Sequence, residues 1–173
     1  MENTVFHNAS GLDEEGHVST ARDIAIMSCQ LLSHEKIKEY STIWMDELRA
    51  GKTQLVNTNR LVRFYKGATG LKTGTTDTAG CCLSASASRG ELSLVAVVLG
   101  CKTDDDRFAD ARSLLDYGFA NFTFTAPPEC SQELGEIPVL DGVSQSVGVV
   151  PNPPAGVLVE KGTEKSLESE VEL

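Results

Sequence analysis

The 173-residue sequence predicts an α+β fold in two parts. Apolar and small residues recur at helical spacing over residues 21–32 and again over 105–121, which indicates two amphipathic helices. Between them, strand-like runs at 80–88 and 92–99 flank a turn, as expected for an antiparallel hairpin. From residue 125 onward, short Val-rich segments are broken by Gly and Pro without a helical period, which is typical of a small β domain.

The first helix has a start signal and an apolar stripe. Thr20 followed by Asp23 resembles a capping box, in which the two side chains satisfy backbone N–H groups at the helix start. The stripe consists of Ala21, Ile24, Ala25, Ser28, Leu31 and Leu32. A short helical turn is expected over 34–40, and the mixed pattern of 42–63 contains a predicted turn at Gly51-Lys52.

The hairpin has two different strands. Two sets alternate along the first strand, one apolar and one of serines: Leu83, Ala85 and Ala87, and Ser84, Ser86 and Ser88. Their small size indicates that another element packs closely over this strand. After the turn Arg89-Gly90-Glu91, the run Leu92 to Leu99 is almost continuously apolar, so the second strand is expected to be buried on both faces.

The second helix begins with three acidic residues, Asp104 to Asp106, which the helix dipole favours at an N-terminus. Its predicted buried stripe is Phe108, Ala111, Leu115, Phe119 and Phe122. The composition changes at Thr125-Ala126-Pro127-Pro128, which predicts a boundary between a part spanning 1–124 and a part spanning 125–173.

Composition limits the classes of function. A net charge of −10 argues against a nucleic-acid partner, because phosphate binding needs a basic face. The five cysteines (Cys29, Cys81, Cys82, Cys101 and Cys130) form no CxxC pair and no Cys/His cluster, so no metal site is expected. Each is interpreted most simply as a small buried hydrophobe. The sequence shows no signal-peptide pattern and no bilayer-spanning apolar run.

The segment Gly70-Leu71-Lys72-Thr73-Gly74-Thr75-Thr76 carries the most chemistry. It combines a cation, several hydroxyls and two glycines just ahead of the small-residue strand. Such a strand can hold a substrate carboxylate and present a backbone N–H to a reacting carbonyl. Taken alone, the tripeptide Lys72-Thr73-Gly74 is also compatible with an exposed strand end and a glycine turn.

Four segments in one order resemble the penicillin-binding-protein type of serine D-alanyl-D-alanine carboxypeptidase. They are Asn8 to Leu12, Gly16 to Asp23, Asn57 to Asn59 and Gly70 to Gly80. The resemblance implies that 1–124 is the C-terminal portion of a β-lactamase/transpeptidase-like catalytic domain, an antiparallel sheet flanked by helices. It also implies that 125–173 begins the family's C-terminal β domain.

The resemblance implies a role for each residue of the strand. Lys72 would supply positive charge to the substrate carboxylate and to the proton network, and the Thr73 hydroxyl would hydrogen-bond that carboxylate. Gly74 would let the substrate backbone lie close, and the N–H of Thr75 would be an oxyanion donor. Arg107 matches a family arginine near the carboxylate pocket, although its type and position also fit a solvated helix-surface cation.

The implied substrate is a peptidoglycan stem peptide ending in D-Ala-D-Ala, and β-lactams are the implied inhibitors because they mimic it. No metal or organic cofactor is implied. The parent protein would act outside the cytoplasm, in the periplasm or on the outer face of the cell membrane. Membrane anchoring would belong only to the full-length parent.

The nucleophile of that family is not found in these residues. The pattern Ser-x-x-Lys occurs at Ser33 to Lys36, but Ser33 is expected at the end of the first helix among polar neighbours, so we reject it as the catalytic pair. No Ser-x-Asn occurs, and His17 and His34 lack a Gly-x-Ser-x-Gly elbow. We therefore expect a C-terminal portion of a longer enzyme, inactive alone and with apolar surface exposed.

Two other interpretations remain open at this stage. One is a fragment of a serine β-lactamase, which shares the Lys-Thr-Gly wall. The Pro127-Pro128 hinge and the β-rich tail favour the carboxypeptidase, because a lactamase domain ends with its last helix. The other is a non-catalytic peptidoglycan-binding or scaffold protein that keeps the fold and has lost the nucleophile.

Overall fold

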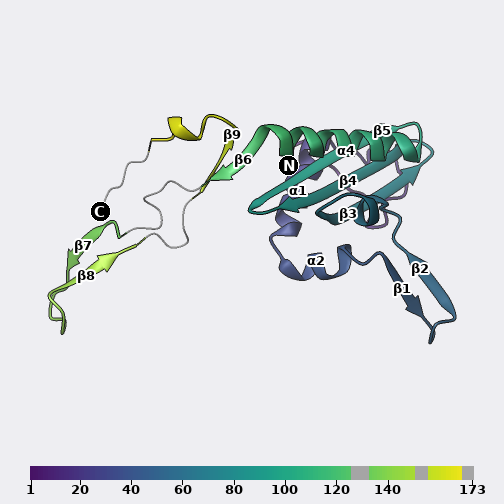
Figure 1. The fold of residues 1–173 in the computed structure, drawn as a ribbon. Helices are drawn as coiled ribbons and strands as arrows, with labels where there is room; N and C mark the ends of the chain where they lie inside the picture. The colour runs from purple at the N-terminus through teal and green to yellow at the C-terminus, as the bar shows by residue number, and fades with distance from the viewer. Residues whose placement is uncertain (126–132, 151–155, 169–173) are drawn as a thin grey trace. The chain divides into compact units, whose positions relative to one another are not determined.

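The computed structural model describes residues 1–125, 133–150 and 156–168. The chain forms two compact units, Met1–Phe119 and Ala120–Leu173, and the division falls in the last turn of helix α4 (Asp104–Asn121). Figure 1 shows the course of the chain through both units. Pro127, Pro128 and Cys130 lie outside the described residues, so the domain boundary at 124–125 stays a prediction.

A three-stranded antiparallel sheet is the centre of the first unit. Its strands are β3 (Ala68–Thr76), β4 (Gly80–Arg89) and β5 (Leu92–Cys101), in the order β3-β4-β5. The predicted hairpin is therefore confirmed as β4 and β5. The predicted α+β class, an antiparallel sheet with flanking helices, is confirmed as well.

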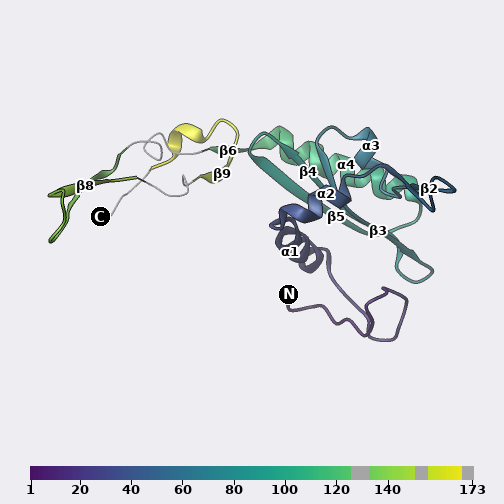
Figure 2. The ribbon, with the colours of Figure 1, turned by 90° about the horizontal axis from the view of Figure 1, so that it is seen from below.

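Helices cover both faces of this sheet (Figure 2). The face toward α4 holds the core, in which Leu83, Ala85, Ala87 and Ala96 of the sheet meet Phe108, Ala111, Leu115 and Phe119 of the helix. Helix α1 (Ala21–Leu32) lies on the other face, where Ser28 and Ser84 share a buried hydrogen bond of 2.8 Å. Serine and alanine on β4 thus allow close packing on both sides, as their small size predicts.

The helix start at Thr20 matches only half of the predicted capping box. The Thr20 hydroxyl accepts from the Asp23 backbone N–H at 3.1 Å. The Asp23 carboxylate instead accepts from the Thr4 hydroxyl at 2.7 Å and from the Asn3 N–H at 2.9 Å. The Thr4 hydrogen bond holds the pKa of this buried carboxyl below its usual value. Asp23 therefore anchors the N-terminal segment to α1.

The prediction that the second hairpin strand is buried on both faces is wrong. Ala96 is the buried residue of β5, and Leu99 is 41% exposed. The strand buried on both faces is β4, because α4 packs on one of its faces and α1 on the other, whereas β5 is an edge of the described sheet. Ile26, Met27 and Leu31 on α1 also remain exposed, so the first unit shows apolar surface as expected.

The segment with a mixed pattern contains a hairpin. Strands β1 (Met45–Leu48) and β2 (Thr53–Val56) pair with Met45 opposite Val56, on either side of the predicted turn. Residues Arg49 and Ala50 adopt φ of 55° there. The predicted helical turn is confirmed as α2 (Glu35–Ser41), and a short helix α3 (Leu61–Phe64) precedes β3.

The buried stripe predicted for the second helix holds for every member except the last. Phe108, Ala111, Leu115 and Phe119 are buried in α4 as expected. Phe122 instead begins strand β6 (Phe122–Thr125) and pairs with Glu160 of β9 (Val157–Glu160). The helix therefore ends at Asn121, where the backbone changes to the strand conformation of the second unit.

The described part of the second unit consists of short antiparallel strand pairs. Strand β6 pairs with β9, and β7 (Gly135–Pro138) pairs with β8 (Ser146–Val149). A 3₁₀ turn follows at Glu164–Ser166. This agrees with the β-rich character predicted beyond residue 125. Across the described parts of both units, no helix combines the length and apolar character needed to cross a bilayer.

A buried tyrosine in the first unit gives a pH-dependent prediction. Tyr65 is 8% exposed, and its hydroxyl donates to Asp116 Oδ1 at 2.7 Å while Arg89 lies over its ring. Burial, with the Asp116 hydrogen bond, raises the pKa of Tyr65 from 10.0 to about 12. Because the folded pKa is raised, the stabilisation is complete below the unfolded value and is lost as pH rises from about 10 to about 12.

The measurement is phenolate absorbance during alkaline titration of a Tyr40→Phe/Tyr117→Phe chain, in which Tyr65 is the remaining tyrosine. Urea unfolding between about pH 9 and about pH 11.5 should show falling stability, and Tyr65→Phe should flatten this slope. A Tyr65 titration near its ordinary pKa in the folded chain would contradict the prediction.

Candidate active site

The predicted substrate-binding wall, which consists of Lys72 to Thr75, lies on β3, an edge strand of the described sheet. Thr73 is opposite Leu83 and Lys72 is opposite Ser84. Because strand side chains alternate, Thr73 and Thr75 face α4 with Leu83, whereas Lys72 projects on the face of Ser84 and α1. Lys72, Gly74 and Thr75 are exposed, and Thr73 is 8% exposed. The strand therefore presents its cation and its buried hydroxyl on different faces.

The Thr73 hydroxyl is held by a second chain segment. It shares a hydrogen bond of 2.7 Å with Thr58 Oγ1, in which either oxygen can donate. The residues on both sides of Thr58 fix its loop, because Asn57 Nδ2 donates to the Ile43 carbonyl and Asn59 Oδ1 accepts from the Leu61 N–H. The polar Asn57-Thr58-Asn59 loop therefore aims one hydroxyl at the wall.

Arg107 connects the wall to helix α4. Its Nη1 donates to the Gly74 carbonyl at 3.0 Å, to Thr75 Oγ1 at 2.9 Å and to the Cys82 carbonyl at 3.3 Å. Its Nη2 pairs with Asp104 at 3.0 Å, and its Nε is buried without a hydrogen-bond partner. At 4% exposure Arg107 is not the solvated surface cation that its sequence position also allowed. The structure thus brings Arg107 together with Gly74 and Thr75.

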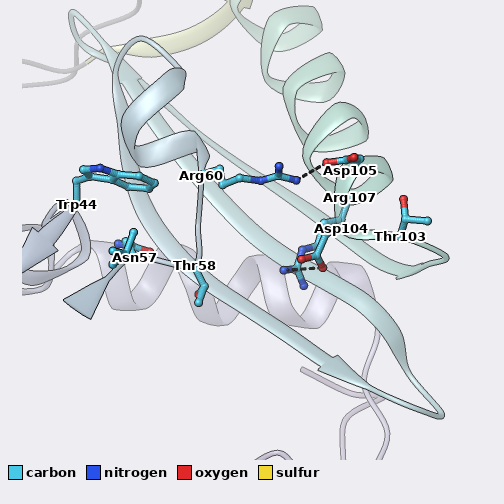
Figure 3. Close-up of a pocket in the computed structure, with 9 residues that line it drawn as sticks. Trp44, Asn57, Thr58, Arg60, Thr103, Asp104, Asp105 and Arg107 are labelled. Carbon is cyan, nitrogen blue, oxygen red and sulfur yellow. Dashed lines mark hydrogen bonds and ion pairs between the residues drawn. The ribbon is translucent and has the colours of Figure 1, made fainter. Parts of the chain in front are cut away.

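A pocket of about 680 Å³ adjoins these contacts (Figure 3). Its lining residues come from the β1–β2 hairpin, the loop after it and the start of α4: Trp44, Val56, Asn57, Thr58, Arg60, Thr103, Asp104, Asp105 and Arg107. Figure 3 shows Arg60 reaching Asp105 and Arg107 reaching Asp104, each as an ion pair. Thr58 and Arg107 both line the pocket and bind the wall, so the pocket lies directly beside it.

Sequence reasoning missed several of these pocket residues. Thr58 was placed only in a polar loop, and no role was predicted for Trp44, Arg60 or Asp105. The polar triplet at 57–59 was the available signal for Thr58. Trp44, packed edge-on against Phe64, and the Arg60–Asp105 pair carry no local pattern that reports a pocket, because each contact joins distant segments.

Room for a ligand exists over Gly74. A Cβ added to this residue would meet no heavy atom within 4 Å, so the backbone there is open to an approaching chain. The Lys72 ammonium donates to the carbonyl of Thr73 in this structure. Although the Lys72 side chain leaves β3 on the face opposite to Thr73, this contact brings its ammonium to the β3 backbone. The cation and the accessible backbone at Gly74 and Thr75 together suit an anionic peptide end.

The Ser-x-x-Lys pattern at Ser33 has no catalytic geometry. Ser33 is the exposed C-cap of α1, and its hydroxyl donates to the Gln30 carbonyl at 2.7 Å. Lys36 lies on the next helix, α2. His17 Nδ1 accepts from the His7 N–H, which is a structural role. Among the described residues, no group of three or more His, Cys, Asp or Glu side chains is placed to hold a metal ion.

Comparisons with known proteins identify the family. Residues 1–103 match the family model described as D-alanyl-D-alanine carboxypeptidase, peptidase S11. The D-alanyl-D-alanine carboxypeptidase DacF of Bacillus subtilis is 38% identical over 165 residues, which cover 94% of this chain and 42% of that relative. The chain thus spans about two fifths of the length of this curated relative.

Solved structures show the same fold. Penicillin-binding protein 5 from Haemophilus influenzae superposes with a TM-score of 0.76 at 29% identity, over 95% of this chain and 48% of that chain. Penicillin-binding protein D2 from Listeria monocytogenes, in its cefotaxime-bound form, superposes with a TM-score of 0.64 at 37% identity, over 69% and 49%. These matches do not favour the β-lactamase or scaffold interpretations. The Lys-Thr-Gly wall and the match over 1–103 together establish that the chain belongs to the D-alanyl-D-alanine carboxypeptidase family.

Proposed function

We propose that this chain is the part of a serine-type D-alanyl-D-alanine carboxypeptidase that holds the substrate, and that the parent enzyme removes the terminal D-alanine from peptidoglycan stem peptides. The observation that carries the proposal is the attachment of β3 at Thr73, Gly74 and Thr75 to Thr58 and Arg107. That attachment fixes a hydroxyl and a backbone segment beside a pocket, on a chain of this family.

Each wall residue acts on a different part of the substrate. The Thr73 hydroxyl donates to the terminal carboxylate, and Lys72 supplies positive charge to it and to the proton network. The substrate backbone lies over Gly74, where a Cβ would otherwise occupy open space. The Thr75 N–H donates to the oxyanion that forms on the scissile carbonyl, an interaction worth roughly 2.7–4 kcal/mol in the transition state.

The attacking serine belongs to another part of the parent enzyme. It forms an acyl-enzyme and releases D-alanine, and water then hydrolyses the ester. β-Lactams acylate the same serine, in keeping with the cefotaxime-bound form of the Listeria relative. The parent works outside the cytoplasmic membrane, where its substrate lies. Detection of an epitope-tagged parent in the cytosolic fraction alone would argue against this location.

A chimera tests the proposal. In it, this chain replaces the matched 165-residue stretch of the Bacillus subtilis DacF, so that the relative supplies the remaining segments. We expect release of D-alanine from an N-acylated peptide ending in D-Ala-D-Ala. Thr73→Val should lower kcat/KM by roughly 10- to 150-fold, because a hydrogen bond to a charged group is worth about 1.5–3 kcal/mol.

Matched variants distinguish a loss of catalytic activity from a loss of folded protein. Thr73→Ser keeps the hydroxyl and should keep most of the activity. Lys72→Met should lower kcat/KM at least as much as Thr73→Val, whereas Lys66→Met, which changes an exposed lysine just before β3, should not. A folded chimera in which Thr73→Val and Lys72→Met leave kcat/KM unchanged would refute the proposed wall.

The chain alone gives a further prediction. Incubated with a fluorescent penicillin, it should form no covalent adduct, because Ser33 is a helix C-cap without a lysine partner and Ser-x-Asn is lacking in the sequence. The chimera should be labelled under the same conditions. Peptide mapping decides the outcome, since an adduct at Ser33 would overturn both the assignment of the nucleophile to another segment and the rejection of this serine.

Arg107 gives a further prediction, on the stability of the wall. Arg107→Ala removes the donor from two carbonyls and a hydroxyl, while the Asp104 carboxylate that it leaves unpaired is exposed, so the free energy of unfolding should fall by roughly 1–3 kcal/mol. Arg112→Ala, on an exposed position of the same helix, should change it by less than about 0.5 kcal/mol. Urea unfolding of both chains is the measurement, and equal effects would contradict the structural role of Arg107.

A further inference from the structure

Two cysteines lie opposite each other at one end of the three-stranded sheet. Cys81 of β4 and Cys101 of β5 are Cα partners in the antiparallel ladder. Opposite residues in such a ladder have Cα atoms about 4.5–5.5 Å apart, and a disulfide needs about 4.4–6.8 Å. The backbone spacing of this pair suits a disulfide, although both residues are free thiols in the structure.

The preceding glycines show independently how closely these two backbones approach. Gly80 and Gly100 have φ of 67° and 73°, a region that favours glycine. A Cβ on Gly80 would lie 2.8 Å from the Cys101 carbonyl oxygen and 3.4 Å from the Gly100 carbonyl carbon. Glycine at position 80 therefore permits the close approach of the strand ends, and the β4–β5 register shifts just beyond Cys81.

Both sulfurs lie on the α4 face. Cys81 Sγ accepts from Thr75 Oγ1 at 3.9 Å, and that oxygen is bound by Arg107 of α4. Cys101 Sγ donates to Asp110 of α4 at 3.7 Å. The neighbouring Cys82 instead directs Sγ to the carbonyls of the β3–β4 turn, at 3.4 and 3.9 Å, so its contacts do not favour it as the partner of Cys101.

We propose that Cys81 and Cys101 form a cross-strand disulfide when the protein meets a low-molecular-weight disulfide, and that this bond fixes the ends of β4 and β5 beside Thr75 and Arg107. The site is a covalent modification site outside the substrate-binding roles of the wall. It rests on the geometry of β4 and β5 and is independent of the proposed carboxypeptidase activity.

The reaction is an ordinary two-step exchange. Cys101 is the more accessible of the two, and its thiolate attacks one sulfur of the oxidant, which breaks the oxidant's S–S bond and releases one thiol. The Cys81 thiolate then attacks Cys101 Sγ in the mixed disulfide and releases the second thiol. The protein loses two protons and two electrons, and the oxidant is reduced to two thiols.

The test uses the full chain with Cys29→Ala, Cys82→Ala and Cys130→Ala, incubated with oxidised glutathione. Burial raises the pKa of the Cys101 thiol, so the reaction is run at about pH 8.5. Trypsin cleavage after Lys72, Arg89 and Lys102 separates the two cysteines into peptides 73–89 and 90–102. We expect these peptides linked, at about 2 Da below their summed mass, and separated again by dithiothreitol.

Single variants in the otherwise native chain identify the partner. Cys81→Ala and Cys101→Ala should each abolish the link between the two peptides, whereas Cys82→Ala should not. Stable glutathione adducts on folded protein without the cross-link would overturn the proposal, and so would a link that survives in Cys81→Ala.

Hydrogen exchange tests the mechanical consequence. In the oxidised triple variant, exchange of the backbone amides at position 75 and at position 82, which is alanine in this background, should slow at least tenfold relative to the reduced protein. A further Cys81→Ser change in the same background should remove this response to oxidant. Unchanged exchange at both amides in the cross-linked protein would refute the claim that the bond fixes the wall.

Discussion

The buried guanidinium of Arg107 is the interaction on which the candidate site depends. A cation removed from water is tolerated when it is paired and hydrogen-bonded, and here the partners are Asp104, two carbonyls and the Thr75 hydroxyl. Strand β3 has a ladder partner on one side only within the described sheet. The ties from Arg107 therefore transfer the position of α4, which is set by its packed core face, to the edge strand that carries the wall.

A second interaction holds the wall in place, so that three chain segments together determine its position. Thr58 holds the Thr73 hydroxyl, and the asparagines on both sides of Thr58 hold its loop. The Arg60–Asp105 pair joins this loop to α4, but it is solvent-exposed and contributes little free energy. Loop, strand and helix start meet around one pocket. A change in the packing of α4 would consequently shift the position of Gly74 and Thr75.

The environment of β4 explains its unusual composition. It lies between two strands and between two helices, so its alanines and serines allow α1 and α4 to approach closely. At its first residues the glycines of β4 and β5 bring the backbones together, next to the hydroxyl that Arg107 binds. Close packing of this kind transmits small displacements, because well-packed interiors have low compressibility. Cys81 and Cys101 lie at this end of β4 and β5, so a small displacement of the pair would directly move the neighbouring wall.

Local sequence patterns were enough to locate the helices at 21–32 and 105–121, the 80–99 hairpin, the Thr20 cap and the Lys-Thr-Gly strand, because periodicity, capping and turn residues act over a few neighbouring positions. They misplaced burial, giving β5 the environment that β4 has, since an apolar run does not report which strand is central. The folded structure was needed to show that Arg107 is buried, that Thr58 contacts Thr73, that Trp44 and Arg60 line a pocket and that Cys81 is opposite Cys101. Each of these contacts joins residues 15 or more positions apart, and such contacts are set by how the elements pack, which no local pattern encodes.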